Sequence, residues 1–473
     1  MRNSIICVIT VIVLLTGYRV APGLTIHEEK MKGRFDNPQA VTRRCLECHK
    51  ETAVNFMKTS HWNWTVKQEI QGKGEQNYGK RNALSGFYTG LASNWPGCTS
   101  CHPGYGWANN DFAFGDPANV DCLICHDSTG TYKKDPLGAG MPMGFTAGKS
   151  GTPGVDLLRI AIKAAKPTRK NCGICHFYCG GGDNVKHGDL DSSLIEPNKN
   201  FDVHMGIDNL DFSCQFCHKT AQHNITGNAL GVSPGGKSRV DCVKCHNWQP
   251  HRQDKINDHT TSVACQTCHI PTYAKNLPTL MAWDWSVAGE DKPEELDKNG
   301  KPTYDKKMGA LKWKKTIWPE YAWFNGKAEV MMAGDIIKPD KLVRLNRPLG
   351  NIDDKTARIF PFKIHRAKQI YDKKNNYLIV PQLVGKNGYW ETFDWNKAAK
   401  GGMEAVKLAY SGEYGFVETE MYVRVNHMVA PAKWALRCAN CHQKKGRFDW
   451  EQLGYTNMVN SYPTEQRKAI AKQ

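Results

Sequence analysis

Apolar residues gather in one short run near the N-terminus, and the rest of the chain is polar or mixed. The run extends from Ile5 to Leu15, follows a basic Arg2 and is followed by small and polar residues. It is shorter than the roughly 20 residues that a membrane span needs, which is typical of a cleaved secretory signal. We therefore expect a signal peptide over residues 1–24, with a retained anchor as the alternative, and no membrane span after cleavage.

Hydrophobic periodicity is weak over most of the remaining chain, and three segments stand out from it. Residues 289–307, with an Asn-Gly pair at the tip, predict an exposed turn or hairpin. Residues 396–412 predict a helix weakened by Gly401 and Gly402, and residues 418–442 predict an extended segment.

Eight copies of one short motif accompany this weak periodicity. Each is Cys-x-x-Cys-His, the attachment signature of c-type haem, in which two thiols bond to the porphyrin and the histidine binds iron. Zinc ribbons also use CxxC pairs, but zinc does not require a histidine directly after every second cysteine. The eight motifs are Cys45/Cys48/His49, Cys98/Cys101/His102, Cys122/Cys125/His126, Cys172/Cys175/His176, Cys214/Cys217/His218, Cys242/Cys245/His246, Cys265/Cys268/His269 and Cys438/Cys441/His442. Eight covalently bound c-type haems are therefore expected.

The placement of the motifs predicts the architecture. Seven lie within residues 45–269, residues 270–437 carry none, and the eighth opens residues 438–473. Haem macrocycles would supply much of the hydrophobic core, so the chain would wrap them in loops and short helices. We expect residues 25–473 to form a single unit, because electrons pass only between neighbouring haems. The predicted fold class is mainly α, a loop-rich multihaem cytochrome c fold with little β structure.

The cysteine count and the net charge indicate whether disulfides can form and which partners the protein can bind. Sixteen of the 18 cysteines belong to motifs, leaving Cys7 and Cys179, so no disulfide framework is available. The 63 basic and 46 acidic residues give a net charge of +17. Haem propionates would offset about eight of these charges in the oxidised protein and about sixteen in the reduced one. Any remaining positive field favours small anions and acidic redox proteins, and no motif suggests nucleic acid.

Nine of the 17 histidines lie outside the motifs and are candidate second ligands of the irons. Scattered among eight haem motifs, most of them are expected to be distal ligands. His27 lies near the expected cleavage point and is set aside, whereas His365 is either the eighth distal ligand or a pocket residue. The seven distal candidates are His61, His187, His204, His223, His251, His259 and His427. Eight capped irons would make an electron wire, and one open iron would make an enzyme.

Four segments, together with the motifs, carry a resemblance to a known family. They are NCGICHFYCGGGDNVKHGDLD (171–191), INDHTTSVACQTCHIPTYAK (256–275), PFKIHRAKQIYD (361–372) and NHMVAPAKWALRCANCH (426–442). With them the chain resembles the octahaem tetrathionate reductase family of periplasmic multihaem c-type cytochromes, relatives of hydroxylamine oxidoreductases and pentahaem nitrite reductases. The resemblance implies seven bis-histidine haems and an active-site haem, second along the chain, whose lysine ligand comes from outside its motif.

The resemblance also implies residue roles. Its second haem is the one on Cys98, Cys101 and His102, and the lysine is best matched by Lys186, with Lys166 and Lys170 as rivals. A lysine binds iron only when neutral, so the site must lower its pKa by burial and nearby positive charge.

Four further residues are assigned to the same pocket. Asp183, three residues before Lys186, would orient that lysine or relay protons to the substrate. Lys275 would hold an anion, and His365 is the remaining histidine candidate. Cys179 is either a small buried side chain or a pocket thiol.

The activity implied by the resemblance is reduction of small anions. Tetrathionate would give thiosulfate, and nitrite or hydroxylamine would give ammonium, with electrons from a quinol-oxidising or small electron-carrier protein in the periplasm. Two other classes stay open: oxidation of hydroxylamine or hydrazine, and electron transfer without catalysis. The oxidising relatives cross-link a tyrosine to the catalytic haem, and the contexts of Tyr455 and Tyr462 do not match that feature.

Overall fold

The computed structural model describes residues 25–87, 90–146, 153–227, 230, 232, 240–443 and 445–455. The predicted signal peptide at residues 1–24 lies outside them. The α-helices are α1 (Ile26–Lys30), α2 (Pro38–Phe56), α3 (Ser60–Asn63), α4 (Trp95–Cys98), α5 (Leu123–His126), α6 (Leu157–Ile162), α7 (Arg169–His176), α8 (Cys214–Cys217), α9 (Asp254–His259), α10 (Cys265–His269), α11 (Tyr389–Thr392), α12 (Trp395–Ala405) and α13 (Cys438–Cys441). The 3-10 helices are η1 (Thr99–Cys101), η2 (Pro117–Asn119), η3 (Ser192–Leu194), η4 (Cys242–Lys244), η5 (Trp285–Val287) and η6 (Ala432–Trp434).

The haem-motif cysteines lie on or next to short helical turns. One turn brings residues i and i+3 to the same side, which is where both thiols of a CxxC pair must be to bond one porphyrin. Helix α2, which carries the first motif, begins where the Asn37 side chain accepts a hydrogen bond from Ala40 N at 2.9 Å. Pro38 follows at its first position, where no amide hydrogen is needed.

Residues without a haem motif build a large sheet. It has eight strands in the order β10-β14-β12-β5-β7-β6, with β13 and β8 also paired to β12. Strand β12 runs antiparallel to β14 and parallel to β5. The strands of the sheet are β5 (Thr279–Asp284), β6 (Tyr304–Asp305), β7 (Gly309–Lys314), β8 (Glu320–Phe324), β10 (Val343–Arg344), β12 (Arg358–Asp372), β13 (Tyr377–Leu378) and β14 (Tyr414–Arg424). Three two-stranded sheets pair β1 (Val66–Ile70) with β2 (Gly74–Tyr78), β3 (Thr220–Ala221) with β4 (Asn224–Ile225), and β9 (Ala328–Val330) with β11 (Asn346–Pro348).

The prediction of a mainly α fold with little β structure is therefore wrong. Residues 270–437 carry no haem motif, so haems cannot supply their hydrophobic core. These residues form an apolar cluster that includes Trp283, Ile370, Val417 and Met421. Strand β12 is buried on both faces, so its sequence lacks the alternation of apolar and polar residues that identifies a half-exposed strand.

The smaller elements follow the sequence more closely. The helix expected over residues 396–412 is α12, which ends earlier, at Ala405. A turn lies at the tip of residues 289–307, where Leu296 bridges to Pro302 in antiparallel fashion. Residues 418–442 begin in β14 and continue as loop and short helix into the last motif.

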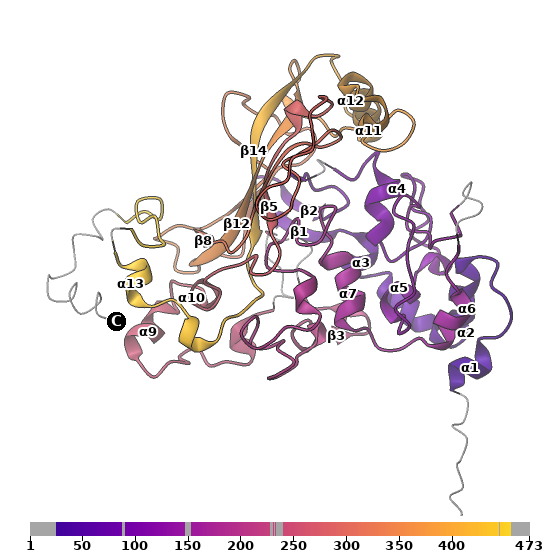
Figure 1. Cartoon of the computed structure of the whole chain (residues 1–473), viewed down its shortest axis with the longest axis horizontal. Helices are drawn as coiled ribbons and strands as arrows, with labels where there is room; N and C mark the ends of the chain where they lie inside the picture. The colour runs from indigo at the N-terminus through magenta and orange to yellow at the C-terminus, as the bar shows by residue number, and fades with distance from the viewer. Residues whose placement is uncertain are drawn as a thin grey trace, which may run out of the picture.

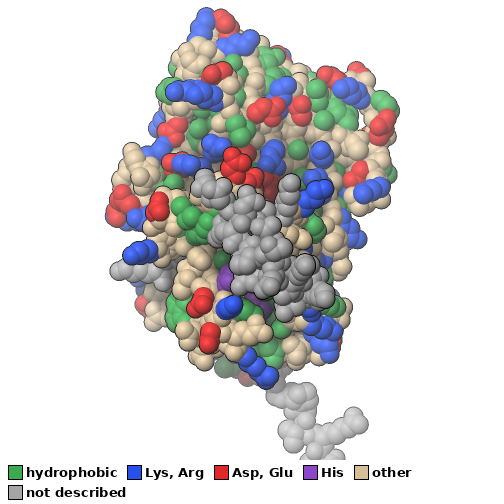
Figure 2. Space-filling model, turned by 90° about the vertical axis from the view of Figure 1, so that its left-hand side faces the viewer, with side chains coloured by type: hydrophobic (Ala, Val, Ile, Leu, Met, Phe, Trp, Pro, Cys, Tyr) green, Lys and Arg blue, Asp and Glu red, His purple; other side chains and the backbone are tan. Residues whose placement is uncertain are grey.

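The sheet and the haem-rich helices lie side by side (Figure 1). Helices α2 and α4 to α7 gather on one side of β5 and β12, while α9, α10 and α13 cluster below β8 at the left-hand end. Figure 2 looks at that end and shows acidic and basic side chains intermingled, so the positive charge forms no single patch on this face. Among the described residues, no helix has the length and apolar character needed to cross a membrane.

Replacing Gly402 with alanine should destabilise the sheet region. An added Cβ would lie 1.7 Å from the Val380 carbonyl oxygen, so α12 would have to move away from the segment that follows β13. We expect a loss of about 2 kcal/mol or more for Gly402→Ala, measured by thermal unfolding of the haem-loaded protein. Gly401→Ala is the matched control, because its Cβ would meet the movable end of the Gln382 side chain at 2.5 Å. Helix propensity favours that change by about 1 kcal/mol, so equal losses in the two variants would contradict the packing argument.

Candidate active site

Seven of the eight motif histidines face a second histidine ring. The centroids of the paired rings lie 6.0 to 6.4 Å apart. The pairs are His49 with His27, His126 with His223, His176 with His61, His218 with His427, His246 with His204, His269 with His251, and His442 with His259.

These separations fit an iron between the two rings. An iron held by two imidazoles needs two bonds of about 2 Å, and each centroid lies about 1.2 Å behind its nitrogen, which gives about 6.4 Å in total. The two cysteines of each motif are available beside each pair, and none of the described cysteines forms a disulfide. The residues at these seven motifs therefore suit c-type haem with two histidine ligands.

The exposure of the motif cysteines differs from one motif to another. One cysteine of the pair is exposed in four motifs, namely Cys48, Cys217, Cys245 and Cys438. Cys48 lies on α2, and the helix kinks at the next residue, His49, whose φ is −112°. These four thiols are therefore open to solvent in the chain without haem. Their assignment to haem attachment does not depend on burial, because thioether formation needs a reachable thiol and not a buried one.

The histidine pairs differ from the sequence expectation at two positions. Six of the seven distal candidates face a motif histidine, but His187 does not, and His27, which was set aside, faces His49 at 6.4 Å. A local signal for His27 was present in the sequence. Thr25 and Glu28 form a capping box at the start of α1, so a helix begins directly after the expected signal peptide.

The second motif is the exception among the described histidines. The His102 side chain is completely buried, and its Nε2 lies 2.7 Å from the Trp62 carbonyl oxygen. An Nε2–H that donates to this carbonyl has no lone pair for iron. Aromatic rings surround the imidazole, and burial lowers its pKa to about 3. These rings belong to Trp62, Trp64, Trp107, Phe112 and Phe114.

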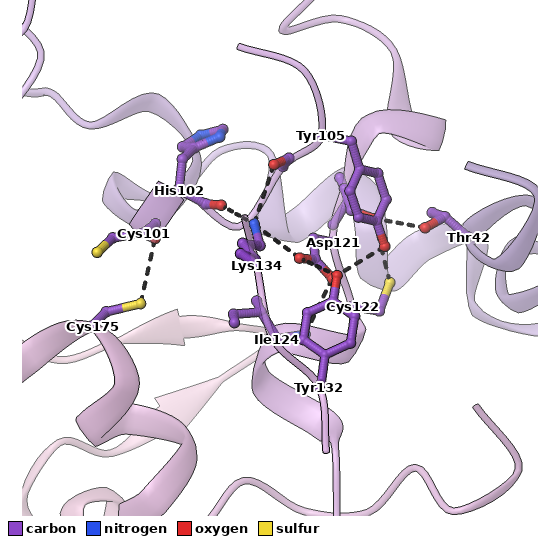
Figure 3. A network of polar contacts seen from close by, with 12 residues as sticks. Thr42, Cys101, His102, Tyr105, Asp121, Cys122, Ile124, Tyr132, Lys134 and Cys175 are labelled. Atoms are coloured by element: carbon purple, nitrogen blue, oxygen red, sulfur yellow. Dashed lines mark hydrogen bonds and ion pairs between the residues drawn. The ribbon is translucent and has the colours of Figure 1, made fainter. Parts of the chain in front are cut away.

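A buried ion pair connects the second motif to the third (Figure 3). Lys134 Nζ lies 2.9 Å from Asp121 Oδ2, and it also donates to the His102 carbonyl oxygen at 2.5 Å. Asp121, directly before Cys122, accepts hydrogen bonds from the hydroxyls of Tyr105 and Tyr132 at 3.1 and 2.8 Å. A buried pair that is so fully hydrogen-bonded favours one backbone geometry, here with His102 turned into its aromatic cage.

Two lysines and a free thiol lie beside the second motif. Burial, and the charge of Lys80, lower the pKa of Lys186, while Cys179 opposes the shift. The loop between them is closed by a hydrogen bond from Lys186 N to the Cys179 carbonyl oxygen at 3.2 Å, and Gly180 has a positive φ of 88° there. The result is a half-buried lysine whose amine is biased toward its neutral, metal-binding form.

Lys80 is a pocket residue that the sequence analysis missed. It follows the β1-β2 hairpin, and its Nζ lies 4.1 Å from the centroid of the Trp64 ring. Burial lowers its pKa, but the surrounding thiols outweigh that effect and raise the pKa overall. These thiols belong to Cys101, Cys179, Cys98 and Cys175. Three of them would be neutral thioethers in a haem-loaded protein, which would weaken this effect. No spacing rule marks Lys80, because only the folded hairpin brings it here.

The other predicted pocket residues are spread over a wider area. Asp183 Oδ1 accepts a hydrogen bond from Ser192 N at 3.0 Å. Lys275 Nζ donates to the carbonyl oxygens of Phe201 and Met428, both at 2.8 Å, and burial lowers its pKa to about 8. Ser192, the partner of Asp183, and Phe201, a partner of Lys275, both line a surface cavity of 480 Å³.

His365 and the rival lysines also have definite places. The completely buried His365 stacks on Phe87 at 4.0 Å between centroids, and its Nδ1 lies 3.2 Å from the Leu280 carbonyl oxygen. It faces none of the motif histidines. Lys166 and Lys170 are exposed, and Lys170 lines the surface cavity rather than the second motif.

Neighbouring motifs are in contact through their cysteines. Four thiol pairs are within hydrogen-bonding reach, Cys45–Cys122, Cys101–Cys175, Cys172–Cys214 and Cys242–Cys265. Three further pairs interact electrostatically, Cys125–Cys172, Cys217–Cys245 and Cys268–Cys441. The motifs thus form a continuous line in the order first, third, fourth, fifth, sixth, seventh and eighth, with the second beside the fourth.

Known proteins resemble this chain over different extents. The family model of bacterial cytochrome c matches residues 280–445. The crystal structure of octahaem cytochrome c from Shewanella oneidensis is similar with 51% sequence identity and a TM-score of 0.85, over 91% of this chain and 97% of that one. A protein of Archaeoglobus fulgidus described only as uncharacterized is 24% identical over 260 residues, which are 45% of this chain and 83% of that protein.

His27→Ala should change the haem of the first motif and leave the other haems unchanged. Removal of the ring that faces His49 leaves one iron with a single imidazole, so we expect one low-spin haem to become high-spin. Electron paramagnetic resonance of the oxidised protein measures this change. Glu29→Ala, at an exposed position of α1, is the control and should leave the spectrum unchanged. Retention of every low-spin signal in His27→Ala would contradict the assignment.

Proposed function

This chain belongs to the octahaem cytochrome c family, and from that premise we propose that it reduces small anions at the haem of its second motif. The family and its motifs make it a multihaem c-type cytochrome that carries electrons. The observation that carries the proposed catalysis is the orientation of His102, the one motif histidine without a facing histidine among the described residues. An iron that lacks both usual imidazoles is the one at which substrate can bind.

In this proposal eight haems are bound, seven of them between the histidine pairs and the second by Lys186. Lys186 suits this role because desolvation lowers the pKa of its amine. The haem iron, when bound, supplies the site at which nitrite, hydroxylamine or tetrathionate accepts electrons. The line of neighbouring motifs supplies those electrons through the fourth motif, whose Cys175 sulfur lies 3.5 Å from the Cys101 carbonyl oxygen.

The side chains around this site suit an anionic substrate. Lys80 brings a cation into the pocket, no described carboxylate pairs with it, and its contact with Trp64 holds the side chain in place. Lys275 lies elsewhere, beside Phe201 and Met428, where two of its three N–H groups donate to carbonyl oxygens and the third can be offered to an anion. A positive, partly desolvated pocket concentrates small anions and favours the more negatively charged states of the substrate.

Protons for the reduction would come from the loop of residues 183–191. Asp183 lies at its start and is partly exposed. Asp191 ends it: burial raises the pKa of that carboxyl group to about 6, and its Oδ2 has no hydrogen-bond partner. An acid with this pKa can release a proton at neutral pH.

Two alternatives receive less support. A plain electron conduit needs no exceptional motif, whereas His102 and the lysines beside it are exceptional. A hydroxylamine or hydrazine oxidase would need a tyrosine at the catalytic haem, but Tyr455 packs on Trp450 near the eighth motif. Tyr462 lies outside the described residues.

The proposed setting is the periplasm, reached through the signal at residues 1–24. The electron donor would be a quinol-oxidising or small carrier protein. Nucleic acid has no place in this proposal.

Lys186→Ala should abolish reduction while preserving the haems. Without the amine, one haem changes its spectrum, and we expect turnover of nitrite and hydroxylamine with a viologen donor to fall roughly 100-fold or more. Haem content, measured by the pyridine haemochrome method, should be unchanged. Lys166→Ala removes an exposed lysine before α7 and should behave like the unaltered protein. Full turnover by Lys186→Ala would contradict the ligand assignment.

Cys179→Ser should separate sulfur from nitrogen substrates. The thiolate would attack the central S–S bond of tetrathionate, releasing one thiosulfate and leaving a Cys–S–S–SO₃⁻ adduct. Two electrons supplied through the haems would then break the S–S bond between Cys179 Sγ and the adduct, releasing a second thiosulfate and restoring the thiolate. Nitrite binds iron through nitrogen and needs no thiol, so we expect tetrathionate turnover to fall far more than nitrite turnover. Equal rates for both substrates relative to the unaltered protein would return Cys179 to a structural role.

A further inference from the structure

One face of strand β12 presents a buried lysine to the loop that carries Lys186. The Lys363 side chain is completely buried, and Nζ donates to the carbonyl oxygens of Val185 and Lys186, both at 2.8 Å. The third contact of the same Nζ is with Thr279 Oγ1 of strand β5 at 2.5 Å. Two strands of the sheet therefore meet the loop at one point.

Thr279 extends this clamp by one residue. Its hydroxyl donates to the carbonyl oxygens of Asn184 and Val185 at 2.6 and 3.1 Å. Three successive carbonyl oxygens, from Asn184 to Lys186, are thus held by two side chains of the sheet. Asn184 itself has a positive φ of 60°, a conformation that such contacts must sustain in a residue other than glycine.

Burial of this lysine is costly for stability. Desolvation lowers the pKa of Lys363 well below its ordinary value, and the charge of Lys186 adds to the shift, while Asp189 opposes it. A methionine of similar length would fill the same space without desolvating an amine. What the lysine supplies is a set of donors to the backbone of the loop, which no apolar side chain can replace.

We propose that Lys363 is a positioning residue, which fixes the backbone at Lys186 so that the amine of Lys186 reaches the iron of the second haem. This inference rests on the proposed function, because it assigns a support to the proposed ligand. A ligand on a loop needs such a support, since displacement by about 1 Å at a reacting centre costs roughly 100-fold in rate. The sheet provides it because β12 is paired along its length and cannot shift.

Lys363→Met in the haem-loaded protein tests the inference. We expect full haem content, a changed electron paramagnetic resonance signature of the lysine-ligated haem alone, and a fall of about tenfold or more in kcat for nitrite. The seven histidine-paired haems should keep their signals, which a general loss of structure would not allow. Lys368→Met is the matched control, because Lys368 lies on the same strand and reaches the opposite face.

Thr279→Val provides an independent variant that retains Lys363 and removes only the hydroxyl. It should change the same haem signal to a smaller extent, and it carries the test if Lys363→Met does not incorporate haem. An unchanged signal and kcat in the variant that carries the test would overturn the positioning role. If Lys186→Ala removes that signal in the same experiments, the proposed function stands while the positioning role fails. If Lys186→Ala leaves the signal intact, the proposed function itself fails.

Discussion

An iron between two imidazoles tolerates very little variation in the distance between the rings. In this chain the distance is 6.0 to 6.4 Å at seven motifs, although the paired histidines can be remote in sequence. His61 faces His176, and His218 faces His427. Each such pair would join distant segments as firmly as a structural metal site. Ligation can therefore replace regular secondary structure as the organising element, and most helices of the haem-rich part are single turns.

The sheet holds the ligand-bearing segments that the haems alone cannot fix. Strand β12 is hydrogen-bonded to the segment of the seventh motif. Ala264 N and Thr267 Oγ1 donate to the Ile359 carbonyl oxygen at 3.0 and 2.8 Å. Strand β14 ends shortly before His427. Asp189 Oδ2 accepts a hydrogen bond from His427 N and also lies 3.2 Å from the ring nitrogen Nδ1. This carboxylate fixes the ring, and it raises the pKa of His427 despite burial. Residues without a haem motif are thus part of the haem architecture.

The sequence indicates local chemistry well and spatial pairing poorly. The eight motifs are readable because attachment depends on five consecutive residues. Which histidine faces which motif depends on the fold, so His187 was expected as a ligand while His27 was not. The second motif has the same residue pattern as the others, and nothing local reveals that His102 turns toward the Trp62 carbonyl. The sheet was missed for a physical reason as well: β12 is buried on both faces, so its sequence lacks the alternation of apolar and polar residues that marks a half-exposed strand.

The position of the second motif explains why an exceptional site can exist there without interrupting the flow of electrons. It lies beside the fourth motif, as a branch of the line and not as a link in it, since Cys125 of the third motif already lies near Cys172 of the fourth. A change of ligand at a haem within the line would shift the reduction potential of a haem through which electrons must pass. A change of ligand in a branch alters only the terminus. The aromatic cage of His102, the buried pair of Lys134 and Asp121, and the amine of Lys186 can therefore depart together from the bis-histidine pattern, and the branch is where substrate chemistry is compatible with an otherwise uniform relay.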